Sequence, residues 1–311
     1  MRPAFYTTEK NMVAKVILNP YAGRWLALQK KQEAETALSK AGIEYELVAT
    51  AAPGEGIRLA AEAAQQGYAP IISAGGDGSI SEVVNGIFLG VGEQKSPPLG
   101  ILPLGSANDL VDNLGLPHDL ESAARVIAAG NTRQLDLCQV NDRYFDNNAA
   151  IGLEPYITLI QQRIQRVRGM IRYLLATLIG IRDNPTWNMS LEWEGGTYQG
   201  PITLVTVGNA PRTGGLFFMT PHADPFDGKL TFVHGYMATR RQILRLLPRT
   251  MKPGKGSYVE HPAIHEVSAA WLRVRAESPT PAHADGEIFS HAIQELEYRI
   301  HPECLPVLLP D

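Results

Sequence analysis

The chain has 311 residues, of which 44% are hydrophobic and 19% charged, and its formal net charge is −4 at pH 7. This ordinary globular composition is long enough for two domains, and its acidic balance argues against nucleic acid as the main partner. Cys138 and Cys304 form neither a CxxC motif nor a disulfide framework, so we expect two buried thiols in a reducing cytosol.

Neither export nor a membrane span is expected from the sequence. Residues 1–15 lack the apolar central region of a signal peptide. The apolar run 173–181 is bounded by Arg172 and Arg182 and is far shorter than the roughly 20 residues that span a bilayer. We therefore predict a cytoplasmic protein.

The N-terminal part of the chain alternates short strand-like runs with helical ones. We predict strands at 13–18, 45–50, 71–74 and 99–104, and helices at 24–42, 54–67, 79–88 and 106–116. Such alternation is typical of a largely parallel sheet covered by helices, in which ligands bind at the carboxyl ends of the strands.

The pattern changes after about Asn131. Residues 133–152 and 187–210 indicate strands separated by Gly, Asn and Asp turns, so we predict a β-rich second domain. A helical insertion at 155–182 and a second helical stretch at 238–251 interrupt these strands.

A glycine-rich turn joins the third predicted strand to its helix, and its glycines are Gly75, Gly76 and Gly78. Ser79 followed by Glu82 fits a capping box, which would place the helix start, with its free amides and positive dipole end, beside these glycines as a phosphate cradle. Asp77 would repel phosphate unless a divalent cation lay between them, so it indicates Mg²⁺ carried with a polyphosphate. Taken alone, Gly-Asp-Gly is also common turn chemistry without a ligand.

A second turn of the same kind follows the next predicted strand, where Gly105, Ser106 and Asn108 precede a helix. Two such loops on neighbouring strands predict a nucleotide site. The sequence contains no GxxxxGK[ST], and the run at Gly54 lacks the third glycine of the dinucleotide fingerprint. His261 and His265 lack the glutamate of HExxH, so we expect surface histidines there.

Taken in order, these motifs resemble those of the diacylglycerol kinase catalytic-domain family, shared by bacterial lipid kinases and sphingosine kinases. Residues 19–23 are similar to the family's first phosphate-side loop, 75–86 to its GGDGT signature, and 100–110 to its LPLGTAND segment. Its C-terminal landmarks are similar to residues 208–215, 220–230 and 283–287. Serine replaces threonine at Ser79 and Ser106, which keeps the hydroxyl, so we expect activity to survive.

The resemblance implies an α/β N-terminal nucleotide-binding domain over 11–134, like that of NAD kinases and phosphofructokinases, and a C-terminal β-sandwich domain over 135–298 that binds lipid and contributes to catalysis. The chain end, about 299–311, is expected to return to the first domain. The resemblance places ATP on Thr50, Gly76, Asp77, Gly78, Ser79, Ile80, Ser81, Glu82 and Ser106. The resemblance also implies Asn19, in the first phosphate-side loop, and from the two glycine turns themselves we add Gly75, Gly105 and Asn108 to this predicted ATP site.

Two Asp-Gly pairs carry the remaining predicted sites. Residues 222–230 are similar to a segment that binds a structural Mg²⁺ in the family, which implies the Asp227 side chain and main-chain oxygens of Asp224 and Lys229 as ligands. In the second pair, Asp285 and Glu287 lie two residues apart, on the same side if the chain is extended. The resemblance implies that one of them accepts the proton of the alcohol, with Asp77 completing the catalytic set, and leaves open which. Both Asp-Gly pairs also strongly predict hairpin turns. A hairpin turn and a functional site can occur together, since a metal can lie on a hairpin.

Basic residues concentrate on the two helical segments of the second domain. In the first, Arg163, Arg166, Arg168 and Arg172 alternate with apolar residues, and the second carries Arg240, Arg241, Arg245, Arg249, Lys252 and Lys255. This pattern suits peripheral contact with an anionic membrane surface at the inner face of the membrane, where each basic residue gives about 1 kcal/mol. Alternatively, each helix packs its apolar side on the core and exposes its charged side to solvent, and for either helix by itself this explains the pattern equally well. The oligomeric state is left open, a homodimer included.

Three functions compete: an ATP-dependent lipid kinase that phosphorylates the hydroxyl of a membrane lipid such as diacylglycerol, an NAD kinase-like kinase of soluble substrates, and a non-catalytic nucleotide- or lipid-binding regulator. An NAD kinase would explain neither the continuation at 79–86 nor the basic segments. A regulator would be expected to have lost a carboxylate from Asp77, Asp227 or the Asp285/Glu287 pair. The sequence therefore favours the lipid kinase and leaves the lipid open among diacylglycerol, phosphatidylglycerol, a sphingoid base or another membrane alcohol.

Overall fold

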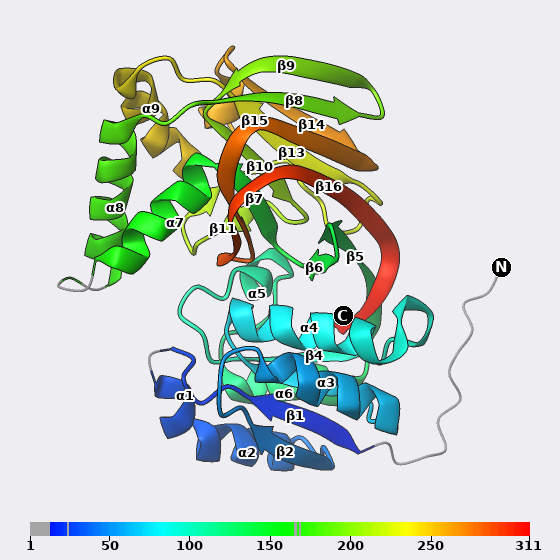
Figure 1. Cartoon of the computed structure of the whole chain (residues 1–311). Coiled ribbons are helices and arrows are strands. Elements are labelled where there is room, and N and C mark those ends of the chain that lie inside the picture. The colour runs from blue at the N-terminus through cyan, green and yellow to red at the C-terminus, as the bar shows by residue number, and fades with distance from the viewer. Residues whose placement is uncertain (1–12, 24, 165–166, 168) are drawn as a thin grey trace. The chain divides into compact units, whose positions relative to one another are not determined.

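The computed structural model describes residues 13–311 except 24, 165–166 and 168 (Figure 1). Most of the predicted N-terminal segment, and Arg166 and Arg168 of the predicted basic set, therefore lie outside the described residues. The chain forms two compact units, each described here by itself. The first contains residues up to 106, together with 116–133 and 305–311, and the second contains 107–115 and 134–304.

The first unit has a parallel sheet with the strand order β2-β1-β3-β4, and the end of the last strand joins β4 by pairing Val307 with Leu99. These strands are β1 (Ala14–Leu18), β2 (Tyr45–Ala49), β3 (Ile71–Gly75), β4 (Leu99–Pro103) and β16 (Glu287–Leu308). Every residue of β3 and β4 is buried, as the continuous apolar runs of strands covered on both faces require. The predicted α/β class is confirmed.

Helices cover this sheet: α1 (Leu26–Gln29), α2 (Lys31–Lys40), α3 (Glu55–Gln66), α4 (Asp77–Val91) and α6 (Leu120–Ala129), with a 3-10 turn η1 (Glu93–Lys95). The helix predicted at 24–42 is thus divided in two. The pair α3 and α4 approaches closely through glycines, because a Cβ on Gly86 would lie 2.3 Å from the Ile57 carbonyl oxygen. This close packing fixes α4, the helix that begins at the first glycine turn.

The second unit is mostly antiparallel sheet, with the order β14-β13-β10-β7-β15-β16; β8 pairs with β15, and β9 pairs with β8. Its remaining strands are β5 (Thr132–Val140), β6 (Arg143–Phe145), β7 (Asn148–Gly152), β8 (Trp187–Trp193), β9 (Gly196–Ile202), β10 (Leu204–Gly208), β11 (Arg212–Thr213), β12 (Phe217–Phe218), β13 (Leu230–Gly235), β14 (Ile264–Ala269) and β15 (Trp271–Ala284). Fully buried Phe145, Phe232 and Tyr298 lie in its main core. The predicted β-rich character is confirmed.

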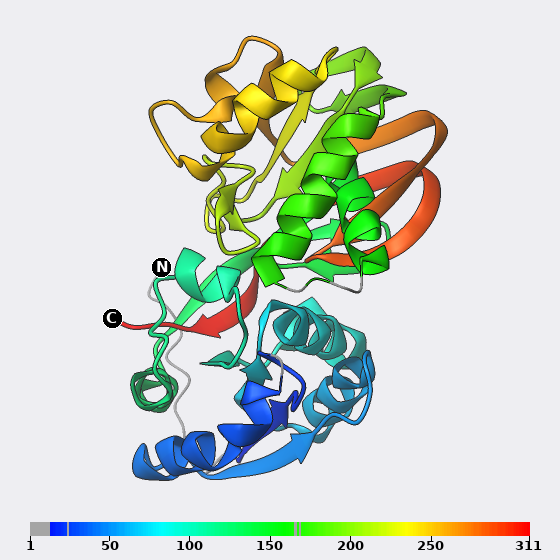
Figure 2. The ribbon, with the colours of Figure 1, turned by 90° about the vertical axis from the view of Figure 1, so that its left-hand side faces the viewer.

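Helices of the second unit are α5 (Asp109–Asn113), α7 (Leu153–Arg163), α8 (Gly169–Asp183) and α9 (Arg240–Leu246), with 3-10 turns η2 (Leu247–Met251) and η3 (Tyr258–Glu260). Helices α7 and α8 (green) and α9 (yellow) face the viewer in Figure 2. A smaller core joins them around residues such as Ile157, Ile181, Ile243 and Tyr258. The helical insertion predicted at 155–182 is therefore two helices packed together.

Residues 107–115 belong to the second unit, whereas the predicted boundary placed them in the first domain. They group with the second unit because side chains of α5 bind a distant hairpin: Asp109 Oδ1 accepts the Gly215 amide at 2.7 Å, and Asp112 pairs with Arg212. Local sequence does not reveal a partner so far along the chain.

Two expectations about the chain as a whole can be compared with the structure. Cys138 and Cys304 are both buried free thiols, as predicted. Among the described residues, the helices are all too short or too polar to cross a bilayer.

Candidate functional site

The loops at the carboxyl end of the first unit's sheet are tied together by hydrogen bonds. Asn19 follows β1, and its main-chain amide donates to the Ala74 carbonyl at 3.0 Å while its side-chain Nδ2 donates to Ser79 Oγ at 2.9 Å. The Leu104 amide, after β4, donates to the Gly75 carbonyl at 2.8 Å. The segments after β1, β3 and β4 therefore form one cluster of loops, which we call the glycine cradle: 19–23, 75–79 and 104–106.

Close approach explains why the cradle needs glycine. A Cβ on Gly75 would lie 2.3 Å from Ser79 Oγ, and one on Gly76 would lie 2.9 Å from the Gly105 Cα. Gly23, at φ +59°, would bring a Cβ within 2.7 Å of the Leu104 carbonyl oxygen. The loops thus present main-chain groups at the strand ends, an arrangement that lets a backbone approach phosphate.

The start of α4 differs from the predicted capping box. Gly76 is the N-cap, and its carbonyl accepts the amides of Ser79 and Ile80 at 2.9 and 3.0 Å. Ser79 is therefore already helical, and its hydroxyl binds Asn19 instead of capping. The helix begins two residues earlier than predicted, so Asp77 lies in its first turn and the positive end of α4 lies at the glycine turn itself.

Glu82 binds another helix rather than its own N-cap. Its Oε1 accepts the Gly54 amide at 2.8 Å, and its Oε2 accepts the Gly56 amide at 2.9 Å. These amides belong to the start of α3, so Glu82 caps α3 from α4 and holds the segment that follows β2. The capping-box prediction was wrong because the partner of Glu82 lies far from it in the chain.

The other residues of the predicted ATP site lie at the end of β2, in α4 or in the second unit. Thr50, buried at the end of β2, donates its amide to the Leu18 carbonyl at 2.9 Å, so it lies at the same sheet edge as the cradle. Ile80 is only 1% exposed and its side chain belongs to the core. Asn108 belongs to the second unit, where it precedes α5 in a left-handed conformation. Ser81, half-buried, and Gly78 lie in α4 near its start.

In the second unit, Asp285 and Gly286 form the two-residue turn between β15 and β16, with φ of 45° and 77°. Ala284 pairs with Glu287 across it, which confirms the Asp-Gly hairpin. The sequence predicted that Asp285 and Glu287 lie on the same side if the chain is extended there. That condition is not met, because Asp285 has the left-handed conformation of a tight turn.

The two carboxylates are held differently. Asp285 Oδ1 accepts the amides of Asn147 and Asn148 at 3.1 and 3.2 Å, and its Oδ2 accepts the Asp146 amide at 3.3 Å. The Glu287 side chain is 47% exposed and lies 3.6 Å from an Arg143 guanidinium nitrogen. Main-chain donors thus fix Asp285, whereas Glu287 stands on the accessible side of the hairpin.

A half-buried carboxylate binds the Asn148 side chain. Glu154, in the first turn of α7, accepts Asn148 Nδ2 at 3.0 Å and lies 3.1 Å from His283 Nε2. Burial opposes ionisation of Glu154, but His283 and the hydrogen bonds outweigh it, so the pKa of this carboxyl is lowered. Sequence reasoning missed Glu154, whose only signal was a lone acid at the start of a helix beside the NNAAIG run.

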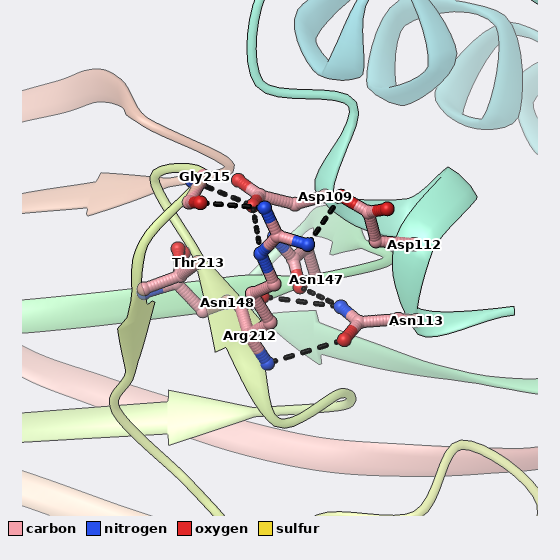
Figure 3. A network of polar contacts seen from close by, with 8 residues as sticks. All are labelled: Asp109, Asp112, Asn113, Asn147, Asn148, Arg212, Thr213 and Gly215. Carbon is pink, nitrogen blue, oxygen red and sulfur yellow. Dashed lines mark hydrogen bonds and ion pairs between the residues drawn. The ribbon is translucent and has the colours of Figure 1, made fainter. Parts of the chain in front are cut away.

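A second set of polar contacts continues from Asn147 to the β11 hairpin (Figure 3). Asn113 Nδ2 donates to Asn147 Oδ1 and to the Arg212 carbonyl, both at 3.1 Å. The Arg212 guanidinium in turn pairs with Asp112 and donates to the Gly215 carbonyl at 2.5 Å. These contacts join α5 and the 208–215 motif to the loop that binds Asp285.

The predicted structural metal ligands lie in one tight turn. Asp227 Oδ1 accepts the Lys229 amide at 2.9 Å, and the Asp224 carbonyl accepts the Asp227 amide at 3.4 Å. Buried Asp136 also faces the turn, because its Oδ2 accepts the Gly228 amide at 2.6 Å. Burial, together with the charges of Asp224 and Asp136, raises the pKa of Asp227.

Such crowded oxygens suit a hard cation, which would offset the carboxylate charges. Within the described residues, however, no three His, Cys, Asp or Glu side chains converge in a metal-binding geometry. The ligand set of Asp224, Asp227 and Lys229, two of them through main-chain oxygens, therefore stays a prediction. Sequence reasoning missed Asp136, whose signal was a single carboxylate within the apolar strand run LDLC.

Most of the described arginines and lysines of the two predicted basic segments are exposed, whereas Arg249 supports a loop. Arg163 is exposed and Arg172 is half-buried. In the second segment, Arg249 donates to the carbonyls of Gly256 and Ser257 at 3.0 and 2.6 Å, so it supports a loop. The exposed members are Arg240, Arg241, Arg245, Lys252 and Lys255.

Two models of known protein families match most of the chain. Residues 13–140 match a family model described as diacylglycerol kinase catalytic domain, and 147–309 match one described as YegS C-terminal NAD kinase beta sandwich-like domain. A crystal structure of a diacylglycerol kinase from Bacillus anthracis has a TM-score of 0.77 at 22% identity, covering 96% of this chain and 97% of that one. At this identity the likeness shows the fold, and together with the family models it confirms the predicted α/β and β-sandwich classes.

Two curated relatives extend over most of the chain. A protein of Staphylococcus saprophyticus named diacylglycerol kinase is 28% identical over 275 residues, which are 88% of each chain. A protein of Chromohalobacter salexigens named "Probable lipid kinase YegS-like" is 31% identical over 279 residues, 89% of this chain and 87% of that one.

Proposed function

The chain belongs to the lipid kinase family defined by the diacylglycerol kinase catalytic domain and the YegS C-terminal domain, and on that premise we propose that it phosphorylates the hydroxyl of a membrane lipid such as diacylglycerol. In this reaction the hydroxyl oxygen bonds to the γ-phosphorus of ATP, ADP leaves, and the hydroxyl proton passes to a base. The observation that carries the proposal is the glycine cradle at the positive end of α4.

We propose that the cradle holds the phosphates of ATP. The family implies ATP, which supplies the phosphoryl group, and we propose Mg²⁺ as the cation that travels with it. The close loops around Gly76 and Gly105 present main-chain groups, and the dipole of α4 adds positive charge to the same place. Asp77, in the first turn of α4, is proposed to act on the phosphates only through the cation.

Glu287 is proposed as the proton acceptor. Its side chain is 47% exposed and so accessible to a hydroxyl, while main-chain donors hold Asp285 in the turn. Asp285 is then the positioning residue that fixes the hairpin from which Glu287 projects. General-base help of this kind contributes roughly 10²–10⁴ in rate.

Two further parts of the proposal concern the second unit. The turn at Asp224, Asp227 and Lys229 is proposed to hold a structural Mg²⁺, which the crowded oxygens there support. The exposed arginines and lysines are proposed to contact an anionic membrane surface, where the lipid acceptor lies.

The test is phosphate transfer from labelled ATP, in Mg²⁺, to a fractionated lipid extract in vesicles, with NAD in lipid-free buffer as a parallel acceptor. The expected product is a labelled lipid formed by the parent protein and greatly reduced in the Glu287→Gln variant. Label in NAD and in none of the lipid fractions would overturn the proposal and indicate a kinase of soluble substrates.

A further inference from the structure

Helix α8 exposes four large apolar residues on one face. Ile171, Leu174, Leu175 and Leu178 are 67%, 47%, 41% and 54% exposed. Their spacing of i, i+3, i+4 and i+7 places them on one helix face. We call these four residues the α8 stripe.

The opposite face of α8 explains why the helix is oriented this way. Ala176, Thr177 and Ile181 are buried, and a Cβ on Gly180 would lie 2.8 Å from Ile157 of α7. The small residues thus allow α7 and α8 to pack closely, which turns the leucines outward. An ordinary surface helix has the reverse arrangement, and exposed apolar faces of this kind mark interaction sites.

Exposed arginines lie on the neighbouring helix α9. The helices α8 and α9 are in contact (Figure 1). The pKa of Asp183, at the end of α8, is lowered by a hydrogen bond from Tyr156, by Arg182 and by the charge of Arg240. Arg241 and Arg245 of α9 are exposed as well. An apolar helix face with a cationic neighbour is typical of elements that lie at a lipid interface.

We propose that the α8 stripe inserts into the boundary between headgroups and acyl chains of an anionic membrane, while Arg240, Arg241 and Arg245 contact its phosphates. The inference rests on the proposed function, because a lipid acceptor requires the protein to reach this boundary. Charge complementarity favours the membrane over a second copy of the chain. A symmetric dimer would use this same surface on both copies, so two patches rich in arginine would share one interface and repel each other.

Salt screens charge attraction and leaves insertion of apolar side chains largely unchanged, so vesicle sedimentation without ATP separates the two contributions. The apolar variant combines Leu174→Gln, Leu175→Gln and Leu178→Gln, and the matched control combines Leu28→Gln and Leu89→Gln, two other exposed leucines. On vesicles of anionic lipid we expect the apolar variant to lose roughly tenfold or more in partitioning, and the control to bind as the parent does.

Salt adds a second prediction for the same vesicles. At about 0.5 M NaCl, where exposed charges are largely screened, the parent should retain the part of its binding that comes from insertion. A variant combining Arg240→Gln, Arg241→Gln and Arg245→Gln should bind weakly at low salt and lose little more at high salt. The apolar variant should be released by salt completely.

The kinase reaction gives a readout that distinguishes the inference from the proposed function. On a short-chain diacylglycerol dissolved as monomers, the apolar variant should turn over as fast as the parent, while it should be slower on vesicle-borne lipid. Absence of turnover by the parent on both substrates would contradict the proposed function, and the vesicle binding would still decide the inference.

Direct contact with acyl chains can be observed by fluorescence. In a Leu175→Trp variant, vesicles containing brominated acyl chains should quench additional emission relative to the parent, whose own tryptophans give the background. Equal quenching in the two proteins, or equal vesicle partitioning of parent and apolar variant, would overturn the proposal. A parent dimer that the apolar variant loses, with unchanged vesicle binding, would assign the stripe to self-association instead.

Discussion

Asp285 and Asn148 hydrogen-bond to each other in both directions: the Asn148 amide donates to Asp285 Oδ1 at 3.2 Å, and the Asp285 amide donates to the Asn148 carbonyl at 2.7 Å. The Asn148 side chain in turn donates to Glu154. The turn that carries Asp285 is thus held from both its main chain and its side chain. The Glu287 side chain, two residues later, is 47% exposed and lies 3.6 Å from an Arg143 guanidinium nitrogen.

This difference predicts distinct effects of two conservative substitutions. Glu287→Gln should lower kcat by roughly 10²–10⁴ with little change in melting temperature, because it removes an accessible base. Asp285→Asn should lower both kcat and stability, because an amide nitrogen would replace one of the oxygens that accept three main-chain amides. Thermal melts beside steady-state kinetics check this, and a stable Asp285→Asn protein with a large loss of kcat would instead make Asp285 the base.

The bond between Asn19 and Ser79 predicts a role for the serine hydroxyl in the glycine cradle. Ser79→Ala removes the acceptor of Asn19 Nδ2, so we expect a loss of about 1 kcal/mol of stability and a raised KM for ATP. Ser79→Thr keeps the hydroxyl and should behave like the parent. A KM for ATP that is the same in all three proteins would contradict a contribution of this bond to nucleotide binding.

The turn at Asp227 is expected to respond to Mg²⁺. Asp227→Ala should lower the melting temperature in Mg²⁺ and reduce the stabilisation that Mg²⁺ gives, since a cation held only by the folded state shifts unfolding by mass action. Asp142→Ala, at an exposed aspartate of the same unit, is the matched control. An equal Mg²⁺-dependent shift in parent and Asp227→Ala would be evidence against a structural ion at this turn.

His234 predicts a loss of stability on the acid side of neutrality. Burial, with a smaller effect of His265, lowers its pKa to about 4. The unfolded chain, with a histidine pKa near 6.5, therefore binds more protons than the folded one between about pH 6.5 and 4, and stability falls as pH falls through that window. His234→Phe should show a smaller drop in melting temperature between pH 7 and 4.5 than the parent or a His291→Phe control. Identical drops would mean that another group carries the acid sensitivity.

Sequence reasoning found the parts of the site that depend on local pattern. The loops at Gly75 and Gly105 follow buried strands, and strand-to-helix alternation is enough to place both at one sheet edge. The capping box failed because Glu82 binds Gly54 and Gly56, which precede it by more than 20 residues. Helix position can be derived from a local pattern, but a side chain with two competing partners cannot be assigned without the tertiary packing.

Other features depended on contacts between distant segments. The amphipathic pattern around Arg172 predicted that apolar residues face either the core or the membrane, and only the packing of α8 on α7 showed that Leu174 and Leu175 face outward. Asp136 and Glu154 were missed because a lone acid in an apolar run has no partner until strands and helices assemble.

Asp77 connects the glycine cradle to the proposed chemistry. Asp77→Asn keeps the shape of the side chain but removes the charge that is proposed to bind the cation, so it should nearly abolish phosphoryl transfer and leave the protein folded. Glu33→Gln, at an exposed acid of α2 in the same unit, is the control for loss of one negative charge.

The most direct measurement of the central claim is transfer of labelled γ-phosphate from ATP to diacylglycerol in anionic vesicles, by the parent, Asp77→Asn and Glu33→Gln proteins at saturating Mg²⁺. The account predicts labelled phosphatidic acid with the parent and with Glu33→Gln, and almost none with Asp77→Asn. Unchanged turnover by Asp77→Asn, or no labelled lipid from the folded parent with diacylglycerol or any other membrane alcohol, would contradict it.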